Sequence, residues 1–332
     1  MNANLPINIG VSGYYEVRLR RPDGRIVPFK GHEKPMKNII TNNGLDSVFT
    51  RTFLASMKYL VVGTGSTAAA VTDTSLETYV ATSSTMSADQ NGVTYSFANR
   101  YKENYRTFEW ANSTGNSVTV YELGMTWLAT SNPAVFSRIV VSAGLTVPNG
   151  YSLVVKYTLR QYVPIWRTPA TTSITVNGAS QSGTLMYVEN LTAASDTVLA
   201  TSFTYPSGNG WESGDTNLLL EPSMISGAST HKARFATSAT QFAGLLTATG
   251  NLPSPVTVTE GSMTNSTYTA GTFTRTKSFK LIAASFPETS FRSFIISAGY
   301  GTNLLIWDGD ASFTKAATHS WTVGMTTTVS RV

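Results

Sequence analysis

Between residues 151 and 163, apolar and polar side chains alternate with a period of two, and this pattern restricts the fold more than any other feature. Asn149-Gly150, a dipeptide typical of tight hairpin turns, separates this segment from a similar one at residues 136–147. The alternation continues over most of the chain from residue 93 onward, which predicts an all-β protein whose antiparallel sheets each bury one face. In the clearest strand the apolar set is Leu153, Val155, Tyr157 and Leu159, and the opposite set is Val154, Lys156, Thr158 and Arg160.

The first 57 residues predict a hairpin followed by a helix. Residues 14–29 alternate around the turn Pro22-Asp23-Gly24, and because a lone hairpin is marginal in water, we assign residues 1–36 to a basic docking arm. Residues 37–57 carry apolar positions at helical spacing, with Asn42 or Asn43 as the cap. Residues 74–77 match a capping box and predict one further helical turn.

Two prolines in the segment 164–169 indicate a linker between two domains. The sequence therefore predicts two tandem antiparallel β-sandwich or jelly-roll-like domains, with the hairpin arm and one or two short helices. The first domain would span residues 37–163 and the second residues 170–332.

The two halves also resemble each other, which favours an internal duplication. The closing strand 153–159 matches 321–327 at an offset of 168 residues. Upstream, Tyr105 and Phe108 match Phe279 and Ile282 at an offset of 174.

Composition narrows the functional classes. The chain has no cysteine and three scattered histidines, which disfavours disulfides and thiolate or histidine metal sites. Only 13% of residues are charged, so much of the surface must be neutral, as expected for a chain that works inside an assembly. No apolar run reaches the roughly 18 residues of a membrane span. Residues 1–6 lack the pattern of a signal peptide, so we expect a protein made in the cytoplasm.

The candidate sites are few, and the sequence indicates no catalytic residue and no cofactor. Asp308-Gly309-Asp310 could contribute to a cation site, with a polar turn between strands as the alternative. An aromatic side chain beside carboxylates suits a sugar-binding loop, with a loop anchored by a buried tryptophan as the alternative. The residues of this glycan candidate are Tyr205, Trp211, Glu212 and Asp215.

Most of the net charge of +5 lies near the N-terminus, where residues 1–40 hold seven basic and three acidic side chains. This excess predicts contact with an acidic protein surface, and it is too small to indicate specific nucleic-acid binding. A solvated hairpin is the alternative. The proposed docking residues are Arg18, Arg20, Arg21 and Arg25.

Three segments resemble structural proteins of tailed bacteriophages. They are 37–46 (KNIITNNGLD), 62–77 with its VGTGS and TDTSLE motifs, and 136–147 (FSRIVVSAGLTV). The resemblance covers roughly residues 37–163 and implies a tail, collar, fibre or baseplate component located in the virion. It further implies other virion proteins as partners, a homo-oligomer in a symmetric assembly, and no enzymatic activity. A receptor- or glycan-binding fibre module that contacts a host surface glycan is the alternative function.

Overall fold

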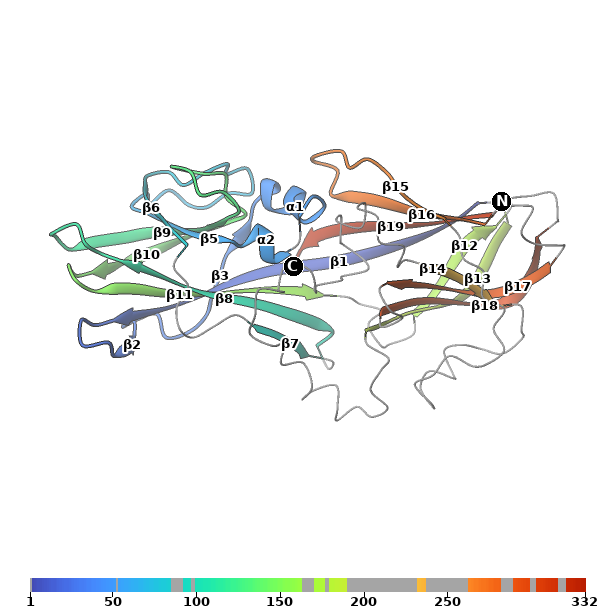
Figure 1. Ribbon diagram of the computed structural model, residues 1–332, viewed down its shortest axis with the longest axis horizontal. Helices are drawn as coiled ribbons and strands as arrows, with labels where there is room; N and C mark the ends of the chain where they lie inside the picture. The colour runs from blue at the N-terminus through green and yellow to red at the C-terminus, as the bar shows by residue number, and fades with distance from the viewer. Residues whose placement is uncertain are drawn as a thin grey trace.

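The computed structural model of the protein describes residues 2–51, 53–84, 92–96, 99–162, 170–176, 179–189, 232–236, 262–281, 289–298, 303–315 and 321–332. In this part of the chain, strands dominate and nearly all neighbours pair antiparallel. The predicted all-β class is therefore confirmed. The molecule is elongated, with the two ends of Figure 1 formed by different sets of strands.

The largest sheet has the order β15-β16-β19-β1-β11-β8-β7, and two short strands, β2 and β3, also pair with β1. Strands from both halves of the sequence therefore share one sheet, and the predicted boundary does not separate them; the linker 164–169 itself lies outside the described residues. The bounds are β1 (Asn2–Arg20), β2 (Ile26–Pro28), β3 (Met36–Lys37), β7 (Gly92–Ser96), β8 (Tyr101–Ala111), β11 (Ser152–Tyr162), β15 (Ser262–Asn265), β16 (Thr274–Leu281) and β19 (Trp321–Arg331).

Strand β1 joins the two ends of the molecule. Residues 10–20 pair antiparallel with β11, whereas residues 2–11 pair parallel with β19 on the opposite edge of the strand. Its inward side chains Leu5, Ile7 and Ile9 are at most 2% exposed. Residues 1–36 are therefore no separate arm, since β1 runs the length of the sheet and only the tip beyond Arg20 projects (Figure 1).

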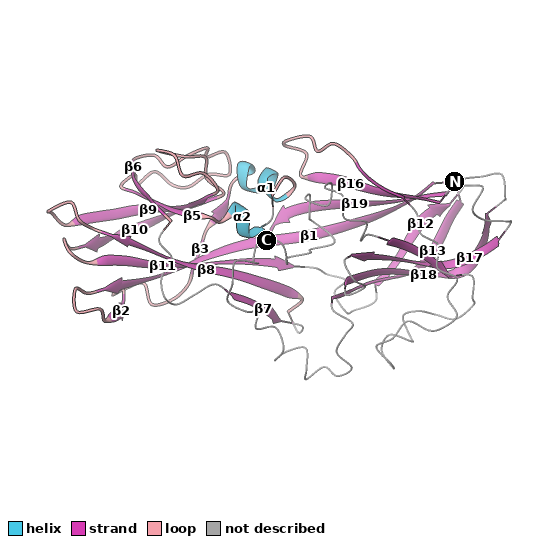
Figure 2. Ribbon diagram, viewed as in Figure 1, coloured by secondary structure: helices cyan, strands magenta, loops and turns pink. Residues whose placement is uncertain are grey.

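Two smaller sheets cover the large one. The first, in the order β4-β10-β9-β5-β6, lies at the end that carries β2, and the second, in the order β12-β13-β18-β17-β14, lies at the other (Figure 2). Side chains of all three sheets belong to one apolar cluster, as expected for sandwich packing. The bounds are β4 (Ile39–Ile40), β5 (Tyr59–Gly63), β6 (Tyr79–Ser83), β9 (Val118–Thr126), β10 (Ser137–Val147), β12 (Ala170–Val176), β13 (Ala179–Glu189), β14 (Lys232–Ala236), β17 (Thr289–Ala298) and β18 (Asn303–Lys315).

The order of strands repeats along the chain. The neighbours β4-β10-β9-β5 have the same arrangement as β13-β18-β17-β14, and β7-β8-β11 the same as β15-β16-β19, with every one of these pairs antiparallel. This match fits the internal duplication suggested by the sequence. Both units share β1, because each unit contributes three strands to the large sheet and β1 pairs with one strand of each set.

Two hydroxyls lie inside the sandwich that carries the helices. The Tyr15 Oη and Ser137 Oγ are 3.0 Å apart and link β1 to β10 across the two layers, while the Asn38 amide donates to Tyr157 Oη. Burial raises the pKa of Tyr157 to about 12 and that of Tyr15 well above its usual value, so both phenols stay neutral and can donate hydrogen bonds.

The helical segment predicted at residues 37–57 contains α1 (Asn42–Val48) and α2 (Phe53–Ser56). Its cap is Thr41, whose Oγ1 accepts the Gly44 N–H at 3.0 Å, and not Asn42 or Asn43. The turn predicted at 74–77 is not helical, because Glu77 bonds to Thr67 instead of capping a helix. No helix in the described ranges is long and apolar enough to cross a membrane.

Side chains of the C-terminal half hold α1 in place. The Tyr268 hydroxyl donates to Asp46 Oδ1 at 2.5 Å, and its ring stacks on Phe49 with centroids 4.7 Å apart. Arg275 donates to the Phe49 carbonyl oxygen at 2.8 Å, where the last turn of the helix leaves an acceptor unpaired. The two units therefore contact each other through this helix as well as through β1.

We predict that Gly44→Ala destabilises the protein although alanine is the better helix former. A β-carbon at Gly44 would overlap the Phe136 carbonyl oxygen. The overlap should cost about 1–3 kcal/mol and outweigh a propensity gain of about 1 kcal/mol. Urea unfolding of this variant beside Asn43→Ala, which lies in the same helix, checks the expectation. A stabilised Gly44→Ala protein would contradict the close approach.

Candidate functional site

The four proposed docking arginines lie at one end of the large sheet, and ion pairs within the chain involve Arg20 and Arg25. Arg20 forms an ion pair with Glu109 of β8 at 3.0 Å. Arg25 pairs with Asp23 in the turn at 2.9 Å, where both side chains are exposed. Arg18 and Arg21 are exposed, on the outer face of β1 and beside the turn. Their docking role stays a prediction.

Other cations of the segment that follows β1 were not singled out by the sequence pattern. Lys30, Lys34 and Lys37 are exposed, and with Arg21 they form no ion pair among the residues that the structure describes. We call Arg21, Lys30, Lys34 and Lys37 the tip cations. An acidic partner could pair with these side chains without breaking an existing ion pair.

The carboxylates proposed for a cation site, Asp308 and Asp310, lie within strand β18 and not in a turn. Asp308 is 5% exposed, whereas Asp310 is exposed at the surface. Within the described ranges, no group of three histidine, aspartate or glutamate side chains could hold a metal ion. The glycan candidates Tyr205, Trp211, Glu212 and Asp215 lie outside the described residues.

The outer face of β1, β11 and β8 carries aromatic and charged side chains that support one another. The Arg160 guanidinium lies over the rings of Tyr14 and Tyr101, at 4.5 and 4.7 Å from their centroids, and pairs with Glu103 at 2.6 Å. One arginine thus connects three strands by cation–π contacts and an ion pair.

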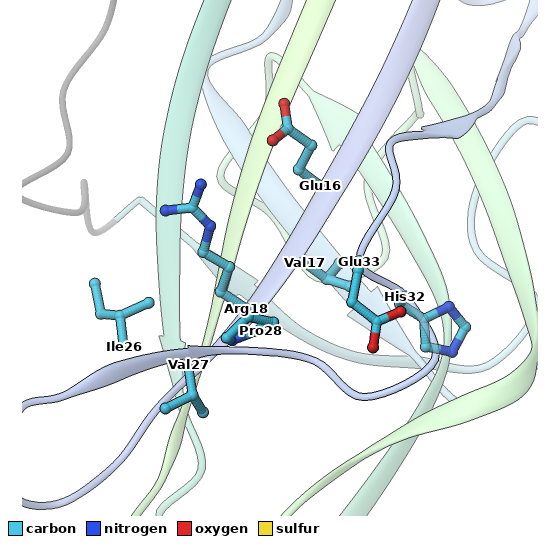
Figure 3. A pocket seen from close by; sticks show the side chains of 8 residues that line it. All are labelled: Glu16, Val17, Arg18, Ile26, Val27, Pro28, His32 and Glu33. Atoms are coloured by element: carbon cyan, nitrogen blue, oxygen red, sulfur yellow. The ribbon is translucent and has the colours of Figure 1, made fainter.

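Two hollows open on the same face, on either side of β1. One, of about 250 Å³, lies over β11 and β8, and the other, of about 330 Å³, lies between β1 and the chain that follows β2. Both are lined by Glu16 and Arg18, so we treat them as one outer groove. Figure 3 shows these two side chains on β1, with Ile26, Val27, Pro28, His32 and Glu33 contributed by β2 and the loop behind it.

The sheet β4-β10-β9-β5-β6 carries an ion-pair network on the face turned away from the large sheet. The sequence pattern does not indicate this network. Glu122 of β9 is fully buried, and its carboxylate accepts a hydrogen bond from the Arg138 guanidinium of β10 at 2.9 Å. Its oxygens also accept the backbone N–H groups of Gly65, Glu77 and Thr78 at 2.7–3.0 Å. We call this set the Glu122 clasp, because it fastens the loop 64–78 over the sheet.

The remaining contacts of the clasp come from the loop itself. Asp73 accepts from Arg138 at 2.7 Å, and hydrogen bonds from the side chain and backbone N–H of Thr67 lower the pKa of Glu77. A β-carbon at Gly63 or Gly65 would approach Glu122 Oε1 at about 2.5 Å, so the carboxylate requires glycine there. The segments 37–46, 62–77 and 136–147 therefore meet at one place in the fold.

No protein family matches this chain, and no curated protein or solved structure is significantly similar to it.

Proposed function

We propose that the protein is a non-enzymatic structural component of a tailed-phage virion, in the tail, neck, baseplate or a fibre. The observation that carries the proposal is the shared strand β1, which completes the large sheet of two sandwich units. A strand that both units need leaves no free hinge between them at that sheet. The result is a stiff, elongated protein. This shape suits a component that fixes the positions of its neighbours and bears mechanical load within a particle.

The resemblance of residues 37–163 to phage structural proteins supports the same proposal. The three segments that carry it are those that meet at the Glu122 clasp and the α1 cap. Their residue types serve close packing and loop fastening, which are needs of a scaffold. A transferable framework of this kind is what a family of assembly proteins would have in common.

Incorporation into particles tests this proposal. Particles of the phage that encodes the chain should contain it in a fixed ratio to the major tail or head protein, as measured by quantitative mass spectrometry. Immunogold labelling should place it at one defined position on every particle. Hydrolysis of a host polysaccharide by the purified chain, or its absence from intact particles, would overturn the proposal.

The tip cations are proposed to dock on an acidic surface of a neighbouring virion protein. We predict that Arg21→Ala with Lys34→Ala lowers incorporation into particles lacking the protein at low salt, and that the deficit relative to the parent chain shrinks as salt rises, because salt screens the contacts that these two cations would make. The matched control is Arg51→Ala with Lys58→Ala, which removes two exposed cations from the helical region. Equal incorporation of both double variants at low and high salt would rule out docking by charge.

A further inference from the structure

The repeated strand order allows side chains of the outer groove to be compared with the residues at equivalent positions of the second unit. The comparison shows which of them the sheet does not need. The pair Tyr105–Thr158 corresponds to Thr276–Thr326 in the second unit, because β11 and β19 occupy equivalent places and each residue faces its partner in register. Likewise Lys156 corresponds to Gly324.

On the second unit this face is small and neutral. Thr276 and Thr326 bond to each other at 3.0 Å, and Thr326 donates to Asn4 of β1. The same sheet thus accommodates a threonine where the first unit has Tyr105, and a glycine where it has Lys156. The larger side chains of the groove are therefore an addition local to the first unit.

The side chains of the groove hold one another in fixed positions. The Lys156 ammonium lies 3.2 Å from the Glu16 carboxylate and 4.9 Å from the centroid of the Tyr105 ring. These contacts restrict three long side chains that would otherwise lose rotamer freedom on binding a ligand. The groove is to that extent preorganised.

The lining of the groove is balanced in charge. Glu16 and Arg18 line both hollows, Lys156 lines one, and Glu33 and His32 line the other, so a ligand of either net charge would meet repulsion as well as attraction. Hydrogen-bond donors and acceptors lie side by side, which matches hydroxyl groups, since each hydroxyl both donates and accepts. The apolar side chains of Val154, Ile26, Val27 and Pro28 provide surface for C–H groups.

We propose that the outer groove binds a neutral oligosaccharide that lies across strands β8, β11 and β1. Its two hollows, of about 250 and 330 Å³, each suit one part of such a chain, and the shared residues Glu16 and Arg18 lie between them. A polyhydroxylated, uncharged ligand satisfies the mixed lining better than an acidic peptide does, because the latter would meet both glutamates. This site is separate from the tip cations and does not rest on assembly into a virion.

Titration of the full-length protein with maltotetraose, cellotetraose and chitotetraose tests the site. Binding is followed by calorimetry and by amide chemical shifts in the NMR spectrum. At least one probe should bind with shifts confined to β1, β8, β11 and the loop after β2. Lys156→Met and Glu16→Gln should each weaken that binding about tenfold, as expected for the loss of one charge-assisted hydrogen bond.

The matched control is Thr326→Ala, which removes a hydroxyl at an equivalent place on the same sheet. It should leave the affinity unchanged, and all three variants should unfold at nearly the temperature of the parent protein. The proposal is overturned if none of the probes binds, if the shifts map elsewhere, or if Thr326→Ala weakens binding as much as Lys156→Met. Shifts in the groove produced only by an acidic peptide would identify a protein-docking surface and would equally overturn it.

Discussion

Replacing Ile7 by aspartate is expected to unfold both sandwich units together, with a loss of about 4 kcal/mol or more of unfolding free energy. Ile7 is 2% exposed and lies opposite Thr327 in the parallel pair of β1 and β19. A carboxylate there would be buried without a partner, which is among the most costly single changes in a protein. Because β1 also pairs with β11, the damage should reach the unit that the mutation does not touch directly.

The control for this variant is the next residue. Asn8 is exposed on the outer face of the same strand, so Asn8→Asp adds the same charge without burying it and should change stability by less than about 0.5 kcal/mol. Urea unfolding followed by fluorescence and by hydrogen exchange of β8 and β16 separates the two units. Loss of protection in β16 alone, with β8 unaffected, would show that the units fold independently and that β1 does not couple them.

Removal of the Glu122 carboxylate is expected to have the second largest effect. Glu122→Ala leaves the Arg138 guanidinium, 3% exposed, without its fully buried anion, so that Asp73 alone remains within 3 Å, and it frees three backbone N–H groups of the loop 64–78. Breaking a buried ion pair from one side costs roughly 3–5 kcal/mol. Glu109→Ala, in the partly exposed pair with Arg20, should cost only about 0–1 kcal/mol.

A double-mutant cycle distinguishes ion pairing from packing at the clasp. Glu122→Ala with Arg138→Met removes both charges, so it should be less destabilised than the sum of the two single variants, because the second change removes a buried charge that has lost its buried partner. Proteolysis of the loop 64–78 should increase in all variants of the pair. Additive losses, or an undisturbed loop, would contradict the role assigned to Glu122.

The strand content could be read from alternation, but the length of β1 could not. Leu5, Ile7 and Ile9 alternate with polar residues as clearly as the predicted hairpin does, yet Pro6 disfavours the interior of a sheet. The proline is accommodated because, among the described strands, this half of β1 pairs with β19 and has no partner on its other edge, where a missing N–H costs no ladder hydrogen bond. Long-range pairing decides this, and no local pattern reports it.

The internal repeat could be detected from the sequence, whereas the residue-by-residue equivalence of the two units could not. Phe108 lies opposite Val155, and Phe279 lies opposite Val323, so the closing-strand match makes Phe108 and Phe279 equivalent, in place of the pairing of Tyr105 with Phe279 expected from the sequence. A strand shifted along its partner keeps an acceptable alternation, and only the ladder of hydrogen bonds resolves the choice.

The candidate sites show the same limit. The predicted arginines lie together at one end because they are close in sequence, so their placement follows from the hairpin. The groove combines Glu16, Tyr105 and Lys156, and the clasp combines Glu122 with the loop before β6; both depend on pairings between distant segments. A buried glutamate in an alternating strand looks like any solvent-facing residue until its partners are known.

The parallel pair of β1 and β19 has a consequence for biogenesis. Strand β1 is synthesised long before its partner β19 and must wait for it, since Asn4 pairs with Gly324. Until then Leu5, Ile7 and Ile9 remain an unsatisfied apolar strand, which could associate with the same segment of another nascent chain. Closing so long a loop is also slow. Folding of this chain is therefore expected to depend on translation speed and on chaperones that cover β1 until β19 has been made.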